Sequence, residues 1–119
     1  MPALMLVNFQ EANGKHYFTY ANTTPEMVAR VFSDYMGREG YRLEQGTAYQ
    51  GTVGIGNQTM RILFGALVKR HSFNFAMQPS GPNVVIEWAK AGKGWTGGVI
   101  GVAKTNSEFT RLSNNLRQI

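Results

Sequence analysis

Three glycines near the C-terminal end have the spacing of a phosphate-binding loop. In the stretch AKAGKGWTGGVIGVAK, Gly92, Gly94 and Gly97 surround Lys93. Backbone N–H groups at the start of a helix, together with a lysine side chain, can hold a phosphate or a carboxylate. The other interpretation is mechanical, because glycines at a helix start let its backbone lie close to a sheet or to a second subunit. We expect the mechanical role first and anion binding, through Lys93 and Gly94, second.

The sequence around these glycines does not fit the known nucleotide-binding motifs. A dinucleotide-binding unit needs a further parallel strand and an acidic residue about 20 positions on. The residues after Gly97 read as one helix, and Lys93 stands between glycines and not before a Ser or Thr as in a P-loop.

A second glycine group lies in GTVGIGNQTMR, which begins at Gly51 and ends at Arg61. As a loop, this stretch would present backbone amides to a phosphate, with Arg61 as a further anion-binding residue. As a strand, its glycines would mark bends. We favour the strand, because Val53 and Ile55 keep alternating.

The residues that could perform catalysis are scattered. The chain has no cysteine, and its serines fit neither a nucleophile elbow nor a triad. His16 and His71 fall on separate strands, so a metal site would also need Glu44 or Glu87. Glu87 is the best acid candidate, although its strand neighbours can cover the core while it faces solvent. We therefore expect a protein that is not an enzyme and has no cofactor and no metal.

The periodicity of apolar residues predicts a strand over 15–20 and then a helix over about 25–38. Thr24 can cap this helix, and Pro25 suits its first position. A second helix is expected from Gly97 or Gly98 to Leu116.

Between the two helices the pattern is extended. Strands are expected at 41–44, at 49–55, from 60 to 77 with a break at 66–70, and at 84–88. A short helix over 60–67 is the alternative for the apolar part. The turn QPSGPN makes the last two strands an antiparallel pair.

This order, β-α-β4-α, predicts an α+β fold with a single curved antiparallel sheet of about five or six strands and two helices on one face. It is similar to the TATA-binding-protein-like and helix-grip architectures. That resemblance rests on element order over most of the chain and implies a sheet that wraps a long C-terminal helix. We expect one domain, 1–119, in which segment 1–14 is an extra strand or an oligomer contact.

Composition narrows the class of protein. The 119 residues are 43% hydrophobic and only 16% charged, and the net charge is +5. This indicates an ordered chain with a partly apolar exterior and a mild preference for anionic partners. The apolar run at the start is too short for a signal peptide or membrane span, so we expect a cytoplasmic protein without a membrane span.

The function expected from these features is binding. A curved sheet and a gripping helix can leave a cavity for an apolar or amphipathic small ligand, or for a protein partner. Alternatives are binding of nucleic acid or another anionic partner through basic strand residues such as Arg42, Arg61, Lys69, Arg70 and Lys90, and a homo-oligomeric structural or regulatory protein. The expected pocket residues are aromatic: Tyr17, Tyr49, Phe73, Phe75, Trp88 and Trp95.

Overall fold

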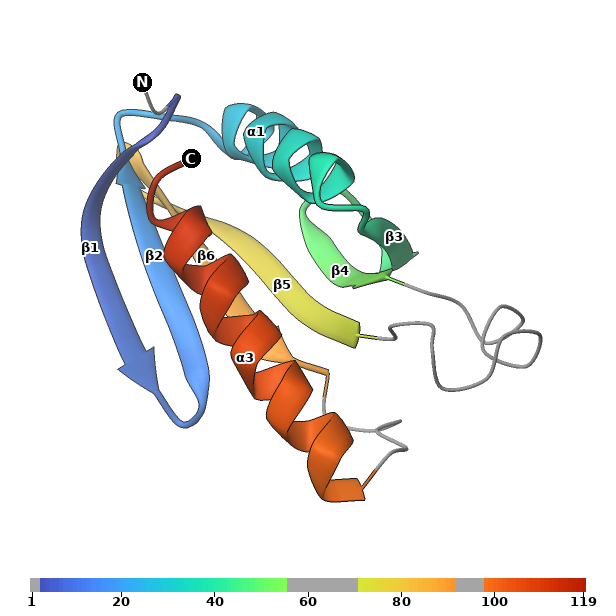
Figure 1. Cartoon of the computed structure of the whole chain (residues 1–119). Helices are drawn as coiled ribbons and strands as arrows, with labels where there is room; N and C mark the ends of the chain where they lie inside the picture. The colour runs from blue at the N-terminus through green and yellow to red at the C-terminus, as the bar shows by residue number, and fades with distance from the viewer. Residues whose placement is uncertain (1–2, 56–70, 92–97) are drawn as a thin grey trace.

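The computed structural model describes residues 3–55, 71–91 and 98–119, and the side chains of the last helix from Asn106 onward. Within these residues a six-stranded antiparallel sheet has the strand order β1-β2-β6-β5-β4-β3. Two helices lie on one face of this sheet (Figure 1). The predicted α+β class and the antiparallel sheet are confirmed. The elements are β1 (Met5–Ala12), β2 (Lys15–Ala21), α1 (Pro25–Arg38), β3 (Arg42–Gly46), β4 (Gln50–Ile55), β5 (His71–Ser80), β6 (Asn83–Lys90) and α3 (Gly98–Leu116).

The chain begins with a hairpin, so the element order has one strand more than the expected β-α-β4-α. Strand β1 pairs with β2 through a two-residue turn, in which Asn13 and Gly14 have φ of 54° and 76°. Positive φ at both turn residues matches the right-handed twist of the paired strands. Within segment 1–14, residues Met5–Ala12 form this strand, and its role as an oligomer contact stays a prediction.

Helix α1 has the predicted bounds. The Thr24 side chain accepts a hydrogen bond of 3.2 Å from the Met27 N–H, and Pro25 occupies the first turn. After the helix, Gly40 adopts φ of 89° and turns the chain into β3. A cap, a proline and a permissive glycine thus fix the helix between β2 and β3.

Strands β5 and β6 form the centre of the sheet. Their hairpin is tighter than the six-residue turn signal, because Ser80 pairs with Asn83 and only Gly81 and Pro82 make the turn. Gly81 has φ of 60°, which suits the first position of such a turn. The predicted break at 66–70, the alternative helix over 60–67 and the loop around Lys93 lie outside the described residues.

The two faces of the sheet differ in chemistry because side chains alternate along each strand. The helix-covered face carries Phe18, Phe73, Ile86 and Trp88, which are all fully buried. Helix α3 packs Phe109, Leu112 and Leu116 against them, and α1 adds Val28, Phe32 and Met36. The opposite face, which neither described helix covers, is called the open face below.

Candidate functional site

The open face is rich in carboxamide side chains. The register places Thr19, Val85 and Thr52 on this face, since their strand neighbours are in the core. Residues paired with these three across strands, or two positions away along a strand, lie on the same face, and they include Asn and Gln from four strands. Each of these amides carries both donors and an acceptor. They are Asn8 and Gln10 in β1, Gln45 in β3, Gln50 in β4, and Asn74 and Gln78 in β5.

A groove of about 630 Å³ crosses the open face from β2 to β3. This volume lies within the range of small-ligand sites. Small residues make its floor, so a ligand can approach the sheet closely. It is lined by Lys15, Gln45, Gly46, Thr47, Gln50, Gly51, Thr52, Asn74, Phe75, Ala76, Glu87, Ala89 and Lys90, and is called the open-face groove below.

Pairing between strands arranges the residues in and beside the groove in two transverse rows; Gln10 and Tyr17 lie beside it, outside its lining. One row runs Gln10, Tyr17, Glu87, Ala76, Gln50 across five strands. The next row runs Ala89, Asn74, Thr52, Gln45 across four strands. Polar residues therefore flank Ala76 in the first row and lie on one side of Ala89 in the second.

Side-chain contacts join Lys15 to Glu87 and Thr52 to Asn74 within the groove. The Lys15 ammonium lies 2.7 Å from the Glu87 carboxylate, and this hydrogen bond and charge raise the pKa of Lys15. The Thr52 hydroxyl donates to the Asn74 amide oxygen at 2.7 Å. This bond directs the Asn74 NH₂ group away from Thr52, so that group can donate to a ligand.

The charges on the open face balance among the strand residues that the structure describes. Lys15 is paired with Glu87, and Arg42 shares the face with Glu44, whose carboxylate accepts a hydrogen bond from Ser72. Lys90 also lines the groove, but its ammonium donates to Asn106 on α3, on the helix side. A charged ligand therefore gains little net attraction from these residues.

The predicted aromatic pocket is divided between locations. Phe73, Phe75 and Trp88 lie together in the core, where Phe73 and Trp88 have ring centroids 5.0 Å apart. Tyr17 is half-buried on the open face, and Tyr49 is 41% exposed just before β4. Trp95 lies outside the described residues.

Trp88 has one unusual property. It is fully buried, with Phe109 stacked at 6.1 Å, yet its indole Nε1 has no hydrogen-bond partner within the described chain. A buried donor without an acceptor is costly.

The basic residues considered for anion or nucleic-acid binding are not gathered at one place in the described residues. Arg61, Lys69, Arg70, Lys93 and Gly94 lie outside the described ranges. Arg42 and Lys90 project from opposite faces of the sheet, since Arg42 pairs with Gly54 whereas Lys90 reaches α3.

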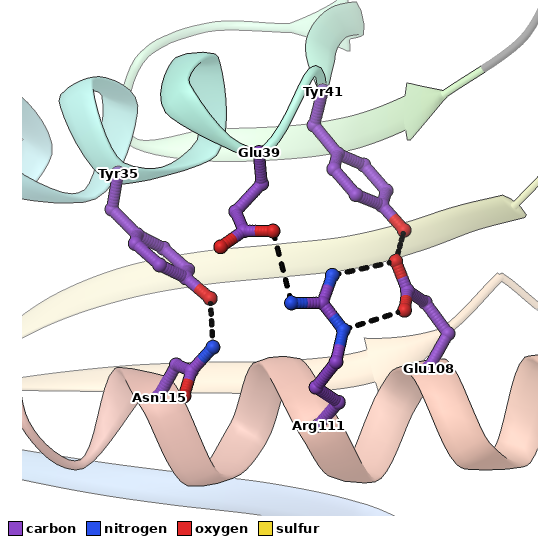
Figure 2. Close-up of polar contacts among 6 residues, drawn as sticks. All are labelled: Tyr35, Glu39, Tyr41, Glu108, Arg111 and Asn115. Carbon is purple, nitrogen blue, oxygen red and sulfur yellow. Dashed lines mark hydrogen bonds and ion pairs between the residues drawn. The ribbon is translucent and has the colours of Figure 1, made fainter.

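A network of ion pairs and a hydrogen bond joins α3 to the segment that connects α1 to β3 (Figure 2). Arg111 binds Glu108 through two contacts of 2.9 and 3.0 Å and Glu39 through one of 2.9 Å. The Tyr41 hydroxyl donates to Glu108 at 2.6 Å. Hydrogen bonds from Arg111 and Tyr41 lower the pKa of Glu108 to about 2, although burial opposes the shift. Because each carboxylate is paired, this network acts as a clamp between elements and does not offer a free acid or base.

Glu11, His16 and Ser113 form an acid, histidine and hydroxyl series of the kind used by hydrolases. Glu11 lies 3.5 Å from His16 Nε2, and Ser113 Oγ lies 2.5 Å from Nδ1. However, Ser113 is only 1% exposed on the inner face of α3. A substrate cannot reach this hydroxyl, so the series supports a structural role.

Glu87 lies on the open face, as alternation along the strand allows, while Ile86 and Trp88 are in the core. Across residues 3–55, 71–91 and 106–119, the His, Asp and Glu side chains form no group of three that is able to hold a metal ion. The described helices include none with the length and apolarity to cross a membrane.

The glycine and aromatic motifs of the sequence do not predict the open-face groove. The available signal was the placement of Gln and Asn at alternate positions opposite core residues, as in Phe73, Asn74, Phe75. Comparison with protein-family models, curated proteins and solved structures found no match. The choice of the open-face groove as the candidate site therefore rests on the geometry of this chain alone.

Proposed function

We propose that this chain is a binding module without catalytic activity, and that it holds a neutral, hydrogen-bonding ligand in the open-face groove. The observation that carries this proposal is the groove itself, a hollow lined by amides, the hydroxyls of Thr47 and Thr52, and a neutralised ion pair. On the helix side, by contrast, Phe73, Phe75 and Trp88 are occupied in packing with α1 and α3.

The floor of the groove allows a direct test. Ala76 and Ala89 are half-buried on the open face, so Ala76→Leu and Ala89→Leu fill the groove without entering the core. Thr19→Leu is the matched control, because Thr19 is half-buried on the same face and does not line the groove.

The measurement is a screen of small neutral polar compounds against the ¹⁵N-labelled full chain by NMR. We expect compounds that bind to shift the backbone amides of Thr52, Asn74 and Ala76. Both filled variants should lose these shifts while Thr19→Leu keeps them. Compounds that bind the filled variants as well as the parent would refute the site.

A second candidate follows from the indole of Trp88, which has no hydrogen-bond partner within the described residues. An amphipathic ligand placed between the sheet and α3 could supply the missing acceptor while its apolar part joins the core. Decanoate is a suitable probe, and the Trp88 indole ¹H–¹⁵N signal, assigned with Trp95→Phe, is the readout. A saturable shift of that signal with the open face unchanged would favour this candidate over the groove.

A further inference from the structure

The open-face groove also indicates the class of ligand. We propose that it binds a neutral polyhydroxylated chain, that is, an uncharged oligosaccharide. This inference rests on the proposed function and adds the chemical class of the ligand.

Hydrogen-bonding capacity is the first argument. Gln45, Gln50 and Asn74 each offer donors and an acceptor, and Glu87 offers carboxylate oxygens. A sugar hydroxyl also donates and accepts at once, so it can bridge two such groups and take part in a cooperative network. The groove therefore suits a ligand that carries hydroxyl groups better than it suits a ligand that only accepts or only donates hydrogen bonds.

Charge is the second argument. Nucleic acids and acidic peptides require unpaired cations along their path. Here the Lys15 ammonium is engaged by Glu87, and the Lys90 ammonium is engaged by Asn106 on the other face. An uncharged ligand does not have to break these pairs.

The direction of the groove is the third argument. It runs across the strands, and the backbone groups of β4, β5 and β6 are used in pairing within the sheet. An extended peptide binds a sheet by adding to a free edge, so it would find only side chains in this groove. From β2 to β3 the distance is about 19 Å at the usual strand spacing, which suits a chain of several sugar units.

Tyr17 is the fourth argument. It lies outside the groove lining but is paired with Glu87, which lines the groove, and it is half-buried on the open face. A tyrosine offers an apolar ring face together with a polar hydroxyl. The C–H face of a sugar ring can pack on such a surface while its hydroxyl groups bind the neighbouring amides.

The test is titration of the ¹⁵N-labelled full chain with maltohexaose, cellohexaose and chitohexaose at millimolar concentration, which detects dissociation constants of about 1 mM. We expect at least one of these sugars to give saturable shifts of the side-chain NH₂ signals of Gln45, Gln50 and Asn74. Gln50→Ala and Asn74→Ala should each weaken binding by about five- to tenfold. Gln78→Ala is the matched control and should leave binding unchanged, because Gln78 is on the same face outside the groove lining.

Heparin hexasaccharide and the uncharged peptide Gly-Ser-Gly-Ser-Gly-Ser serve as comparison probes. Absence of saturable groove shifts with all three neutral sugars would overturn the oligosaccharide inference. If heparin, the peptide or the polar compounds still shift the groove and the filled variants abolish this, the binding role stands and only the ligand class is wrong. If none of these probes shifts the groove, the proposed function fails as well.

Discussion

Ser113 Oγ and His16 Nδ1 lie 2.5 Å apart and connect the inner face of α3 to β2. The imidazole packs between Phe9 and Phe109, with ring centroids at 5.3 and 4.6 Å. This contact is one of the few polar links between the last helix and the first hairpin, and it is sensitive to protonation.

Acidification should weaken the fold through His16. Burial is the main cause that lowers the pKa of His16 below 6.5, and Lys90 adds to it while Glu11 opposes it. A histidine with a lowered pKa in the folded state stabilises the fold fully above pH 6.5, and this contribution falls as the pH drops below 6.5. Urea unfolding at pH 7.5 and 5.5 should show this loss in the parent and a smaller one in His16→Asn. An NMR titration that gives His16 a pKa above 6.5 would contradict the assignment.

Removal of the Ser113 hydroxyl should abolish its contact with His16 and destabilise the fold at neutral pH. Ser113→Ala leaves the buried His16 nitrogen without its partner, and we expect a cost of about 1 kcal/mol in the free energy of unfolding. Ser107→Ala, on an exposed position of α3, is the control. Equal unfolding free energies for the two variants would show that the contact contributes nothing.

The ion pairs of Glu108 should control the stability of the fold at a lower pH than His16 does. The pKa of Glu108 is about 2 in the folded chain and 4.5 in the reference state, so its stabilisation is present above pH 4.5 and is lost as the pH falls from 4.5 towards 2. Glu108→Gln should cost about 2 kcal/mol at pH 7 and flatten the stability profile in this window. Asp34→Asn, which removes an exposed pair with Arg38, should change stability by less than about 1 kcal/mol. If the free energy of unfolding of Glu108→Gln depends on pH between 4.5 and 2 as it does in the parent, Glu108 does not stabilise the fold through this network.

Substitution of two of the glycines by alanine should change the stability of the fold in opposite directions. A Cβ at Gly51 would overlap the backbone carbonyl of Gln45 in the neighbouring strand, whereas a Cβ at Gly37 in α1 meets nothing within 4 Å. Gly51→Ala should therefore lower the melting temperature, and Gly37→Ala should raise stability by about 1 kcal/mol. If Gly51→Ala melts at or above the parent temperature, β3 and β4 do not approach as closely as described.

The edge strand β1 should mediate self-association. Met5 and Val7 are 55% and 54% exposed on a strand that pairs only with β2 in the described sheet. Such an edge can pair with another copy, and a lysine discourages this. Light scattering should show a mass above 13.2 kDa that falls to 13.2 kDa in Val7→Lys. A parent that is monomeric at high concentration would refute this prediction.

The sequence was sufficient to predict the elements whose ends carry a local chemical signal. Thr24 and Pro25 marked the start of α1, and the alternation of Val84, Ile86 and Trp88 marked β6. The β1 turn also had such a signal in Asn13 and Gly14, which is the strongest short hairpin motif. The prediction of an extra strand or an oligomer contact over 1–14 does not include this turn.

The groove could not be predicted in the same way, because it depends on which strands become neighbours. Lys15 and Glu87 are 2.7 Å apart only because β2 pairs with β6, and Thr52 meets Asn74 only through the pairing of β4 with β5. Alternation assigns each residue to a face, but not to a partner on that face. The same holds for the clamp, since nothing local links Tyr41 to Glu108.

The strand order has a consequence for how the chain is made. Strand β2 is next to β6, so the first hairpin emerges from the ribosome long before the strand that joins it to the sheet. A lone hairpin is marginally stable in water, and pairing between distant segments is slow. The nascent hairpin therefore lacks its sheet neighbour until β6 is made, and its apolar side stays uncovered until α3 follows. The chain is most open to aggregation or to capture by a chaperone before these two elements are synthesised.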